Sequence, residues 1–505
     1  MEKLTRRQLV VGSAAGLVGA VANAEAHPHP HPTIRSWDLE VDVIVVGMGI
    51  AGGAAALEAV RSGAKVLVLD RGAAAAKASH GGIFYLGGGT ALQRALGVED
   101  DPEEMQKYLL ASAGAAPDAE RIRVLVEHSV EDFDWLLSLG MPFKERLAPG
   151  SDIPAGGGLY HSGNELGYPY RDLARPAPRG HTPAGVRAPW LQGRMIELAK
   201  GAGATLLLSA SAEQLLTGAD GSIEGVLASV DGERRALRAR QGVVLATGGF
   251  ALNREMVANH APECLGCAPF DLAVNDGWGI RAGQQAGGEA IRMGAAALFW
   301  ALYPPVSRKA GVLVNRQGQR FIAEDSYYGT TGNVIVNEQR GVAHLIVDAQ
   351  ALGEKPDRGR TTPGQRASEI AAQADSIEEL ERALEIPAPA LQNTITVYND
   401  YAKKREDPFF RKAAAYLRPL EKPPFSAVKA SVGEGLFAFF TLGGLHVSPR
   451  SEVLDKQGDP IAKLYAAGRA AAGIPSLHSA SYLSGLSLSE CLTFGRIAGA
   501  NAAKG

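Results

Sequence analysis

A glycine-rich segment between two apolar runs near the start of the chain constrains the fold more than any other feature. Residues Val41–Val46 form a nearly continuous apolar run, which is typical of a buried parallel strand, and Gly47-Met-Gly49-Ile-Ala-Gly52 follows directly. An alanine-rich stretch then runs to about Ser62, Gly63 is placed to end that helix, and Lys65–Asp70 repeats the strand pattern. This order predicts a strand–helix–strand unit that binds a dinucleotide.

The glycines and the acid of this motif each have a separate physical task. Gly47 allows a tight turn, Gly49 lets the backbone approach a pyrophosphate, and Gly52 lets the helix pack closely against the strand. The start of the helix offers free N–H groups and the positive end of its dipole to the phosphates. Asp70 ends the second strand, where its carboxylate can accept a hydrogen bond from a ribose 2′-hydroxyl.

Length, charge and cysteine content narrow the class of protein. The chain has 505 residues and a formal net charge of -3, so it is long enough for two or three domains and lacks the basic balance of a nucleic-acid binder. Its three cysteines do not make a disulfide framework. Cys264 and Cys267 have the spacing of a redox or zinc motif, but no second pair follows nearby in the sequence. We therefore expect two ordinary thiols and no metal site.

The first 32 residues have the pattern of an export signal followed by a linker. Thr5-Arg6-Arg7-Gln8-Leu9-Val10 is a twin-arginine pattern, a mildly apolar stretch follows to about Ala22, and Ala22-Asn23-Ala24 is a small-x-small cleavage site. The apolar stretch is too short to span a bilayer. We expect export by the twin-arginine route to the periplasm or another extracytoplasmic space, without stable membrane insertion. The alternative is a chance Arg-Arg pair before an alanine-rich tail.

Two later segments repeat the pattern of a buried strand that runs into a glycine turn, at Val243–Gly249 and Leu464–Arg469. This arrangement resembles the two-dinucleotide-binding-domain flavoproteins, in which a final helix points its N-terminus at the flavin. Here that helix is expected from about Glu490 to Ala503. The resemblance implies FAD as cofactor, bound by both ends of the chain.

The residues expected to contact FAD lie at the glycine turns and helix starts. They are Gly47, Gly49, Ala51, Gly52, Asp70, Arg71, Ser79, Gly81, Gly82, Ala246, Thr247, Gly248, Gly468, Arg469, Ser487 and Leu488.

A stretch between the FAD segments departs from the strand–helix–strand pattern. We interpret it as an inserted α+β catalytic or cap domain within an α/β fold, whose main part is a Rossmann-like FAD domain of the two-dinucleotide-binding-domain type. It contains a predicted hairpin at Gly311–Ile322 and predicted helices at Ser376–Leu384 and Pro389–Lys404. The expected limits are 38–275 and 436–505 for the FAD domain and 276–435 for the insertion.

Four stretches carry a more specific resemblance: Ser79–Thr90, Ala174–His181, Gln319–Tyr327 and Ser481–Leu488. They resemble the superfamily of FAD-dependent fumarate reductases and 3-ketosteroid dehydrogenases, and are most similar to the branch of 3-oxo-5α-steroid 4-dehydrogenases. The likeness extends over about residues 40–503.

The same resemblance bears on the substrate. Fumarate reductases carry a His-x-x-x-Arg pair before the final helix, whereas this chain has His478-Ser-Ala-Ser-Tyr482. Those enzymes also place a proton-donating arginine after the predicted hairpin, whereas this chain has Ala323–Tyr328, which ends in two phenols. A dicarboxylate would meet no guanidinium at either place. A neutral cyclic ketone fits these residues better.

For activity, the resemblance implies α,β-desaturation next to a ketone. A base removes the acidic proton beside the carbonyl, and a hydride leaves the β carbon for flavin N5. Tyr327, Tyr482 and Ser484 match residues that similar enzymes use. We expect Tyr482 with Ser484 to accept or relay the proton, Tyr327 to hold the carbonyl oxygen, and backbone N–H groups around Gly485 to stabilise the oxyanion.

Several alternatives stay open. Ala323 stands where relatives have asparagine, and the run from His478 to Ser481 is closer to the fumarate reductases. The substrate could therefore be a small oxo-cyclohexane carboxylate, or the reaction could be reduction of an activated C=C bond. The chain could also be a flavin-binding protein without catalysis, with Tyr327 and Tyr482 as packing residues and Tyr328 and Tyr85 as further candidates. Since the sequence has no haem or iron–sulfur motif, we expect a diffusible or protein electron acceptor.

Overall fold

The computed structural model describes most of the chain after its N-terminal segment. The described residues are 36–72, 82–114, 116–148, 156–271, 274–300, 306–352, 370–433, 437–475 and 482–505. The predicted export signal and two expected FAD contacts, Ser79 and Gly81, lie outside them. Contacts group Ser36–Gly505 into one compact unit, so the predicted limits between the FAD domain and the insertion stay predictions.

An eight-stranded sheet forms the first part of the fold. At its centre, β1 (Leu39–Val46) lies parallel to β2 (Val66–Leu69) on one side and to β9 (Glu233–Leu245) on the other. Beyond these, β6 (Thr205–Leu207) extends the parallel array next to β2, and β20 (Pro460–Ala466) extends it next to β9. The sheet therefore combines strands from both ends of the chain, and the predicted strands are confirmed.

Antiparallel strands complete this sheet. The strands β7 (Ser211–Thr217), β8 (Ile223–Val230) and β9 form an antiparallel meander in chain order. At the other edge, β19 (Glu452–Leu454) pairs antiparallel with β20. The parallel strands are buried along most of their length because helices cover them.

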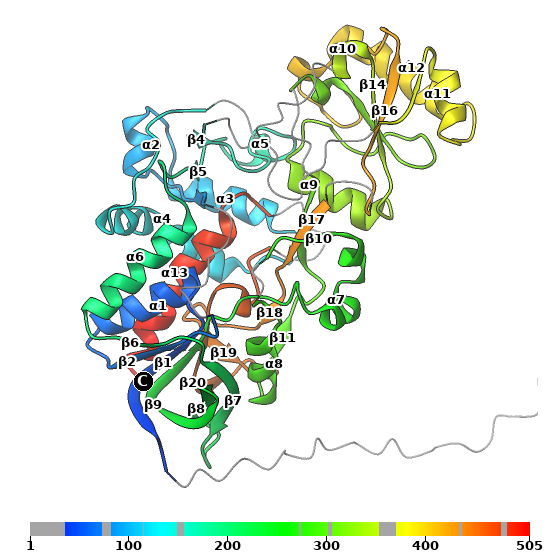
Figure 1. Ribbon diagram of the computed structural model, residues 1–505. Helices are drawn as coiled ribbons and strands as arrows, with labels where there is room; N and C mark the ends of the chain where they lie inside the picture. The colour runs from blue at the N-terminus through cyan, green and yellow to red at the C-terminus, as the bar shows by residue number, and fades with distance from the viewer. Residues whose placement is uncertain are drawn as a thin grey trace, which may run out of the picture. The chain divides into compact units, whose positions relative to one another are not determined.

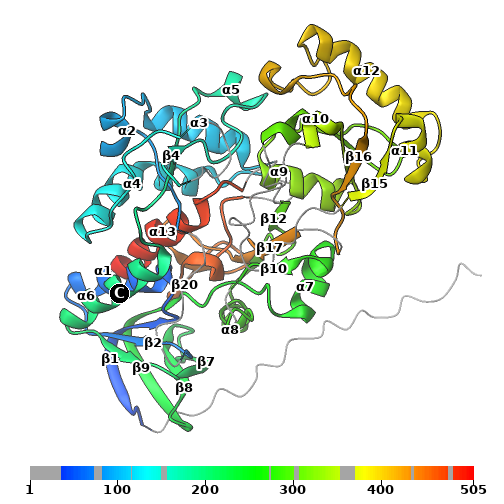
Figure 2. The same ribbon diagram turned by 45° about the horizontal axis from the view of Figure 1, so that its top comes forward.

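The first and last helices of the chain, α1 (Ile50–Arg61) and α13 (Leu486–Ala502), lie side by side next to the sheet (Figures 1 and 2). The contact depends on glycine. A Cβ atom on Gly495 would lie 2.6 Å from the carbonyl oxygen of Ala51, and one on Gly499 would lie 2.1 Å from that of Ala55. These two glycines let the helix backbones touch.

The predicted start of the last helix at Glu490 is wrong, because α13 begins four residues earlier, at Leu486. Serines at 487 and 489 have weak helix propensity, and this pattern favoured a turn. Packing overrides that propensity, since Leu486, Leu488 and Ser489 are all buried.

A small antiparallel sheet packs beside α3 (Pro102–Ser112) and α4 (Ala119–Ser138). Its strand order is β3 (Phe84–Tyr85), β5 (Gly180–His181), β4 (Leu159–Tyr160). This sheet carries buried aromatic side chains, and its strand β3 lies against Gly485, at the turn that precedes α13.

The middle of the chain forms a second, four-stranded antiparallel sheet in the order β13 (Val312–Val314), β14 (His344–Val347), β16 (Phe425–Lys429), β15 (Ile370–Ala374). Two helices pack near it, α11 (Ile377–Ala383) and α12 (Ala390–Lys404), and both were predicted. Ser376 caps α11 by accepting a hydrogen bond from the Glu379 N–H.

The predicted hairpin at Gly311–Ile322 is confirmed only at its turn. The chain reverses between Val314 and Arg320, which form an isolated antiparallel bridge, and the strand partner of β13 is the distant β14. The second strand of the hairpin does not form, because the carboxylate of Glu324, which pairs with Arg320, accepts the Leu313 N–H at 2.9 Å in place of a backbone carbonyl.

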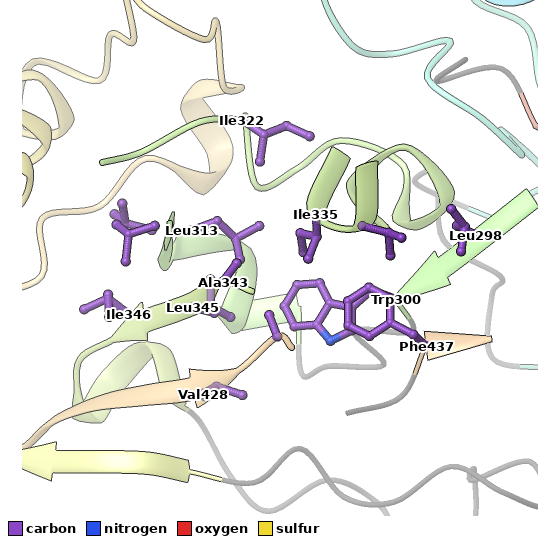
Figure 3. Close-up of a cluster of buried hydrophobic side chains, with 14 of the residues drawn as sticks. Leu298, Trp300, Leu313, Ile322, Ile335, Ala343, Leu345, Ile346, Val428 and Phe437 are labelled. Carbon is purple, nitrogen blue, oxygen red and sulfur yellow. The ribbon is translucent and has the colours of Figure 1, made fainter. Parts of the chain in front are cut away.

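A hydrophobic core joins this second sheet to a three-stranded sheet formed by β10 (Ala268–Pro269), β17 (Phe437–Thr441) and β12 (Ala296–Trp300). Figure 3 shows the Trp300 ring stacked beside Phe437, with Leu298 and Ile335 nearby. Cys264 and Cys267 are buried in the same core as free thiols. Burial raises the pKa of the Cys267 thiol to about 12, so both residues act as apolar packing groups.

Within the described ranges, no helix is long and apolar enough to cross a membrane. The same residues contain no group of three or more His, Cys, Asp or Glu side chains that could hold a metal ion.

Candidate active site

The glycine turn after β1 has the geometry that a dinucleotide needs. Gly47 has a φ of +94°, and a Cβ there would lie 2.5 Å from the Ala246 oxygen. A Cβ on Gly52 would lie 1.9 Å from the Gly47 oxygen, so this close contact also requires glycine. In contrast, a Cβ on Gly49 would meet no protein atom within 4 Å. The second glycine therefore faces open space at the start of α1, where a pyrophosphate would approach.

Asp70 stabilises this turn from the end of β2. It is only 7% exposed, and its two carboxylate oxygens accept hydrogen bonds from the Met48 N–H and the Gly72 N–H, both at 2.8 Å. A carboxylate has about four acceptor positions, so each oxygen keeps capacity for a ribose hydroxyl.

The other predicted FAD contacts in the described chain lie after three strands, β2, β9 and β20, before β3, and at the starts of α1 and α13. Gly248 and Gly468 have left-handed backbones, with φ of +79° and +63°. The two predicted arginines have carboxylate partners: Arg71 pairs with Asp276 at 2.9 Å and Arg469 with Asp271 at 2.6 Å. The remaining positions are Ala51 in α1, Gly82 before β3, Ala246 and Thr247 after β9, and Ser487 and Leu488 in the first turn of α13.

Three hydroxyl groups form a hydrogen-bonded chain at the predicted catalytic residues. The Ser484 Oγ lies 2.8 Å from the Tyr327 hydroxyl and 2.7 Å from the Tyr328 hydroxyl. The two tyrosine rings are 4.3 Å apart between centroids. Ser484 and Tyr327 are buried, whereas Tyr328 is partly exposed. Residues 157 positions apart in the sequence thus share one hydrogen-bonded group of hydroxyls.

Burial governs the ionisation of this chain. It raises the pKa of Tyr327 well above the ordinary value, and the neighbouring phenols of Tyr328 and Tyr482 add to the effect. The hydrogen bond from Ser484 opposes the rise. Tyr327 is consequently a neutral phenol at physiological pH, and it can pass a proton rather than hold a negative charge.

Tyr482 lies in an aromatic wall and not in the hydroxyl chain. Its ring packs edge-on against Phe440 at 5.0 Å and against Phe299 at 5.9 Å, and Phe299 also contacts Tyr328 at 6.1 Å. Phe299 therefore joins the ring of Tyr482 to that of Tyr328 along one apolar surface.

Two groups direct positive electrostatic character at the Tyr482 hydroxyl. Burial raises its pKa, while the guanidinium of Arg469 and the backbone N–H of Gly485 oppose that rise. Gly485 has a φ of +94°, and a Cβ there would lie 2.7 Å from the Tyr85 nitrogen. Only glycine fits this position, which begins α13.

A buried charged cluster lies behind this turn. Arg179 forms a two-point ion pair with Asp100, at 2.6 and 3.0 Å, and both side chains are fully buried. The Tyr85 hydroxyl faces Arg179. Glu165 is 1% exposed, one of its oxygens accepts the Gly163 N–H at 2.8 Å, and burial raises its pKa to about 7.

The structure brings together Tyr327, Ser484, Tyr482 and Gly485, as the resemblance implied. It adds groups that the sequence did not single out as part of the site: Phe299, Phe440, and Asn164, whose Oδ1 accepts a hydrogen bond from the Tyr327 N–H at 2.9 Å. Phe299 and Phe440 come from strands that pair across β12 and β17, and no local motif marks them. Tyr328 is adjacent to Tyr327 in the sequence, and that adjacency is the signal that marks it as a further site residue.

Glycine turns shaped for a dinucleotide, with two helix starts beside them, define an FAD-binding oxidoreductase. The family described as FAD binding domain matches residues 42–488, and the chain belongs to that family, within the superfamily of fumarate reductases and 3-ketosteroid dehydrogenases. FAD is therefore its cofactor.

Three relatives place the chain within this superfamily. The crystal structure of 3-ketosteroid-delta4-(5alpha)-dehydrogenase from Rhodococcus jostii RHA1, in complex with 4-androstene-3,17-dione, is 38% identical with a TM-score of 0.86, and the match covers 94% of this chain and 99% of that one. The 3-oxo-5-alpha-steroid 4-dehydrogenase of Comamonas testosteroni is 29% identical over 86% of this chain and 93% of the relative. A probable fumarate reductase of Shewanella frigidimarina is 27% identical over 92% of this chain and 74% of the relative.

Proposed function

We propose that the chain catalyses FAD-dependent α,β-desaturation of a cyclic ketone, with a 3-oxosteroid as the substrate class. The observation that carries the proposal is the hydroxyl chain of Tyr327, Ser484 and Tyr328 beside the aromatic wall of Phe299 and Tyr482. A chain of neutral hydroxyls can move a proton, and an aromatic wall suits a flat, uncharged ring system. The name of the Rhodococcus relative, which is 38% identical, supports the same substrate class.

The contacts favour a division of roles different from the one expected from the sequence. Ser484 contacts Tyr327 and Tyr328, so we assign these three residues to the proton. Tyr482 lies outside the hydroxyl chain, against Phe440 and Phe299, and the charge of Arg469 opposes the rise of its pKa, so we assign the Tyr482 hydroxyl to the carbonyl oxygen. The Gly485 N–H bonds to the Tyr482 hydroxyl and orients it, so that the phenol O–H would donate to that oxygen and stabilise the enolate that develops as the proton leaves.

The bound flavin supplies the acceptor for the hydride that leaves the β carbon. The protein residues deal with the proton. Because the pKa of Tyr327 is raised, a standing tyrosinate is not available, and the proton leaves the substrate as it is passed along the hydroxyls. Tyr328 is partly exposed, so its hydroxyl is the member of the hydroxyl chain from which the proton reaches solvent.

Reduction of an activated C=C bond is the second candidate, since it is the same chemistry in reverse. The 27% identity to a probable fumarate reductase over 92% of this chain favours a general likeness in reaction. The phenols of Tyr482 and Tyr328, at the places where the fumarate reductases carry arginines, argue against a dicarboxylate as the compound reduced.

Anaerobic flavin reduction tests the proposal. The holoenzyme is mixed with a 3-oxosteroid, the same steroid without the ketone, an oxo-cyclohexane carboxylate, or succinate. Only ketones should bleach the flavin, and the steroid should do so fastest. If none of them bleaches it, while fumarate or an enone reoxidises reduced enzyme, the chain is a reductase. No reaction in either direction would refute catalysis of this kind.

Two variants connect the activity to the site. Ser484→Ala and Tyr327→Phe should slow flavin reduction by about 10²–10⁴-fold, the usual contribution of a positioned acid or base. Ser451→Ala and Tyr398→Phe are matched controls, because each removes a buried hydroxyl elsewhere. The Ser451 hydroxyl donates to the Phe494 carbonyl, and the Tyr398 hydroxyl donates to the Ala310 carbonyl and accepts from the Lys412 ammonium. The controls should keep the wild-type rate.

Export by the twin-arginine route is a separate proposal that depends on the sequence of residues 5–24 alone. Replacing Arg6 and Arg7 by lysine should leave the protein in the cytoplasm, as judged by cell fractionation. Unchanged export would contradict the proposal.

A further inference from the structure

One short segment, Ser162–Asn164, contacts both halves of the hydroxyl chain. The carbonyl oxygen of Ser162 accepts a hydrogen bond from the Ser484 N–H at 2.8 Å. Two residues later, the Asn164 Oδ1 accepts one from the Tyr327 N–H at 2.9 Å. Tyr327 and Ser484 come from distant parts of the chain, and this segment connects them through hydrogen bonds to the backbone of each.

The Asn164 side chain holds the first turn of helix α9 (Tyr328–Asn333) at two points. Tyr327 precedes that helix, and its N–H is the one that Asn164 accepts. The Asn164 Nδ2 donates to the Thr330 Oγ1 at 2.7 Å. Because the amide oxygen and the amide nitrogen of Asn164 each hold a different residue, they fix the rotation of the turn as well as its position. They therefore also set the direction of the Tyr327 phenol.

The segment is itself anchored in the protein interior. Asn164 is 6% exposed, and its own N–H donates to the hydroxyl of the buried Tyr108 in α3 at 2.8 Å. A Cβ on Gly163 would lie 2.4 Å from the Leu483 side chain and 2.5 Å from the Tyr108 hydroxyl, so the segment also packs directly against the turn that carries Ser484. These contacts leave little freedom for the segment to shift.

We propose that Asn164 is a positioning residue for proton transfer, which sets the distance and direction between the Tyr327 hydroxyl and Ser484. The inference rests on the proposed function, because it gives Asn164 importance only through those two hydroxyls. Hydrogen-bonded proton transfer depends steeply on distance, and displacement of a reacting group by about 1 Å can cost about 10²-fold in rate. Asn164 should thus affect the rate of the chemical step and not substrate binding.

The test measures flavin reduction in the anaerobic holoenzyme with a 3-oxosteroid. Asn164→Ala should lower the limiting rate by about 10²-fold while the substrate Kd, taken from the saturation curve, changes less than about 3-fold. The kinetic isotope effect of deuterium on the carbon that loses its proton should increase, because proton transfer becomes slower than hydride transfer. Thr330→Val removes only one of the two side-chain hydrogen bonds and should give a smaller loss.

Asn399→Ala is the matched control. The Asn399 side chain also makes two hydrogen bonds to one neighbouring segment, to the N–H and the carbonyl of Leu420, at 2.8 and 3.0 Å. Its loss should lower the melting temperature and leave the reduction rate and isotope effect unchanged.

The possible outcomes separate the inference from the proposed function. If Ser484→Ala and Tyr327→Phe slow reduction but Asn164→Ala and Thr330→Val match the Asn399 control, the positioning role is refuted and the proposed function stands. If Ser484→Ala and Tyr327→Phe keep the full rate, both are refuted. If Asn164→Ala fails to fold, Asn164→Asp, which keeps the acceptor for the Tyr327 N–H, and Thr330→Val make the same comparison.

Discussion

Replacing the buried Glu165 by glutamine should remove a pH-dependent loss of stability. The Glu165 carboxyl lies in the charged cluster behind the site, where burial raises its pKa from 4.5 to about 7 although Arg179 opposes the rise. As pH increases through this window, the unfolded chain loses the proton and the folded protein keeps it. The folded state therefore becomes less stable between pH 4.5 and about 7, and the loss is complete above that range.

The magnitude follows from the difference between the two pKa values. A difference of about 2.5 corresponds to about 3 kcal/mol of unfolding free energy at 1.36 kcal/mol per pKa unit. The neighbouring groups change little in the window. Arg179 and Asp100 remain a buried ion pair, and the Tyr85 pKa is raised further above its ordinary value by burial. The pKa of His161 is lowered to about 4 by burial, and its contribution cancels when variant and wild type are compared.

The assay is thermal unfolding of the holoenzyme from pH 5 to pH 8. For a protein of this length, 1 kcal/mol corresponds to about 1 °C in Tm. Part of the loss is complete by pH 5, so the Tm of Glu165→Gln should gain about 2.5 °C on the wild type from pH 5 to pH 8. Glu324→Gln is the control of opposite sign. Burial of Glu324 is outweighed by Lys412 and Arg320, which lower its pKa, so its stabilisation is complete above pH 4.5 and is lost only as pH falls below that. Its Tm difference from wild type should be constant from pH 5 to pH 8. If the Glu165→Gln difference is equally constant, the reasoning is wrong.

Four further substitutions test other parts of the molecule. Gly52→Ala places a Cβ 1.9 Å from a backbone oxygen, so it should lower the Tm of the apoprotein and weaken FAD binding by about 10–100-fold. Gly49→Ala places a Cβ with no protein atom within 4 Å, so it should weaken FAD binding without lowering the Tm of the apoprotein. FAD titration and apoprotein melting distinguish the two. Tyr482→Phe should lower the limiting rate of flavin reduction by about 10²–10³-fold. If the variant keeps the wild-type rate, the assignment of Tyr482 to the carbonyl oxygen is wrong. Trp300→Ala should cost about 3–5 kcal/mol in stability and leave the reduction rate of the folded enzyme unchanged, as chemical denaturation and stopped-flow kinetics would measure.

The sequence predicted the parts of the fold that depend on local pattern. The Val41–Asp70 unit needs a buried strand, a glycine turn and a helix in order, and each leaves a mark on adjacent residues. The helices at Ser376–Leu384 and Pro389–Lys404 were predicted for the same reason. The Gly311–Ile322 hairpin was correct only at its turn, because the Leu313 N–H is taken by the Glu324 side chain and the strand partner of β13 begins at His344, beyond the range of any turn signal.

The candidate site could be predicted only in part. The resemblance selected Tyr327, Tyr482 and Ser484, but their division into two groups depends on contacts across 157 residues. Asn164 carries no signal of its own, because an asparagine in a glycine-rich loop usually serves a turn. Only the folded structure shows that the Asn164 side chain makes hydrogen bonds to both Tyr327 and Thr330.

The contact between α1 and α13 has a consequence for how the protein is made. The glycines of α13 that face Ala51 and Ala55 lie 444 positions later in the sequence than those alanines, and the ribosome makes them correspondingly later. At about 5–20 residues per second, the first helix waits roughly 20–90 s for its neighbour. During that time the alanine-rich face of α1 has no cover, and the flavin has only half of its site. Cofactor loading must therefore follow the synthesis of α13, and a chain that stops before Leu486 should collect in the cell as flavin-free, aggregation-prone protein.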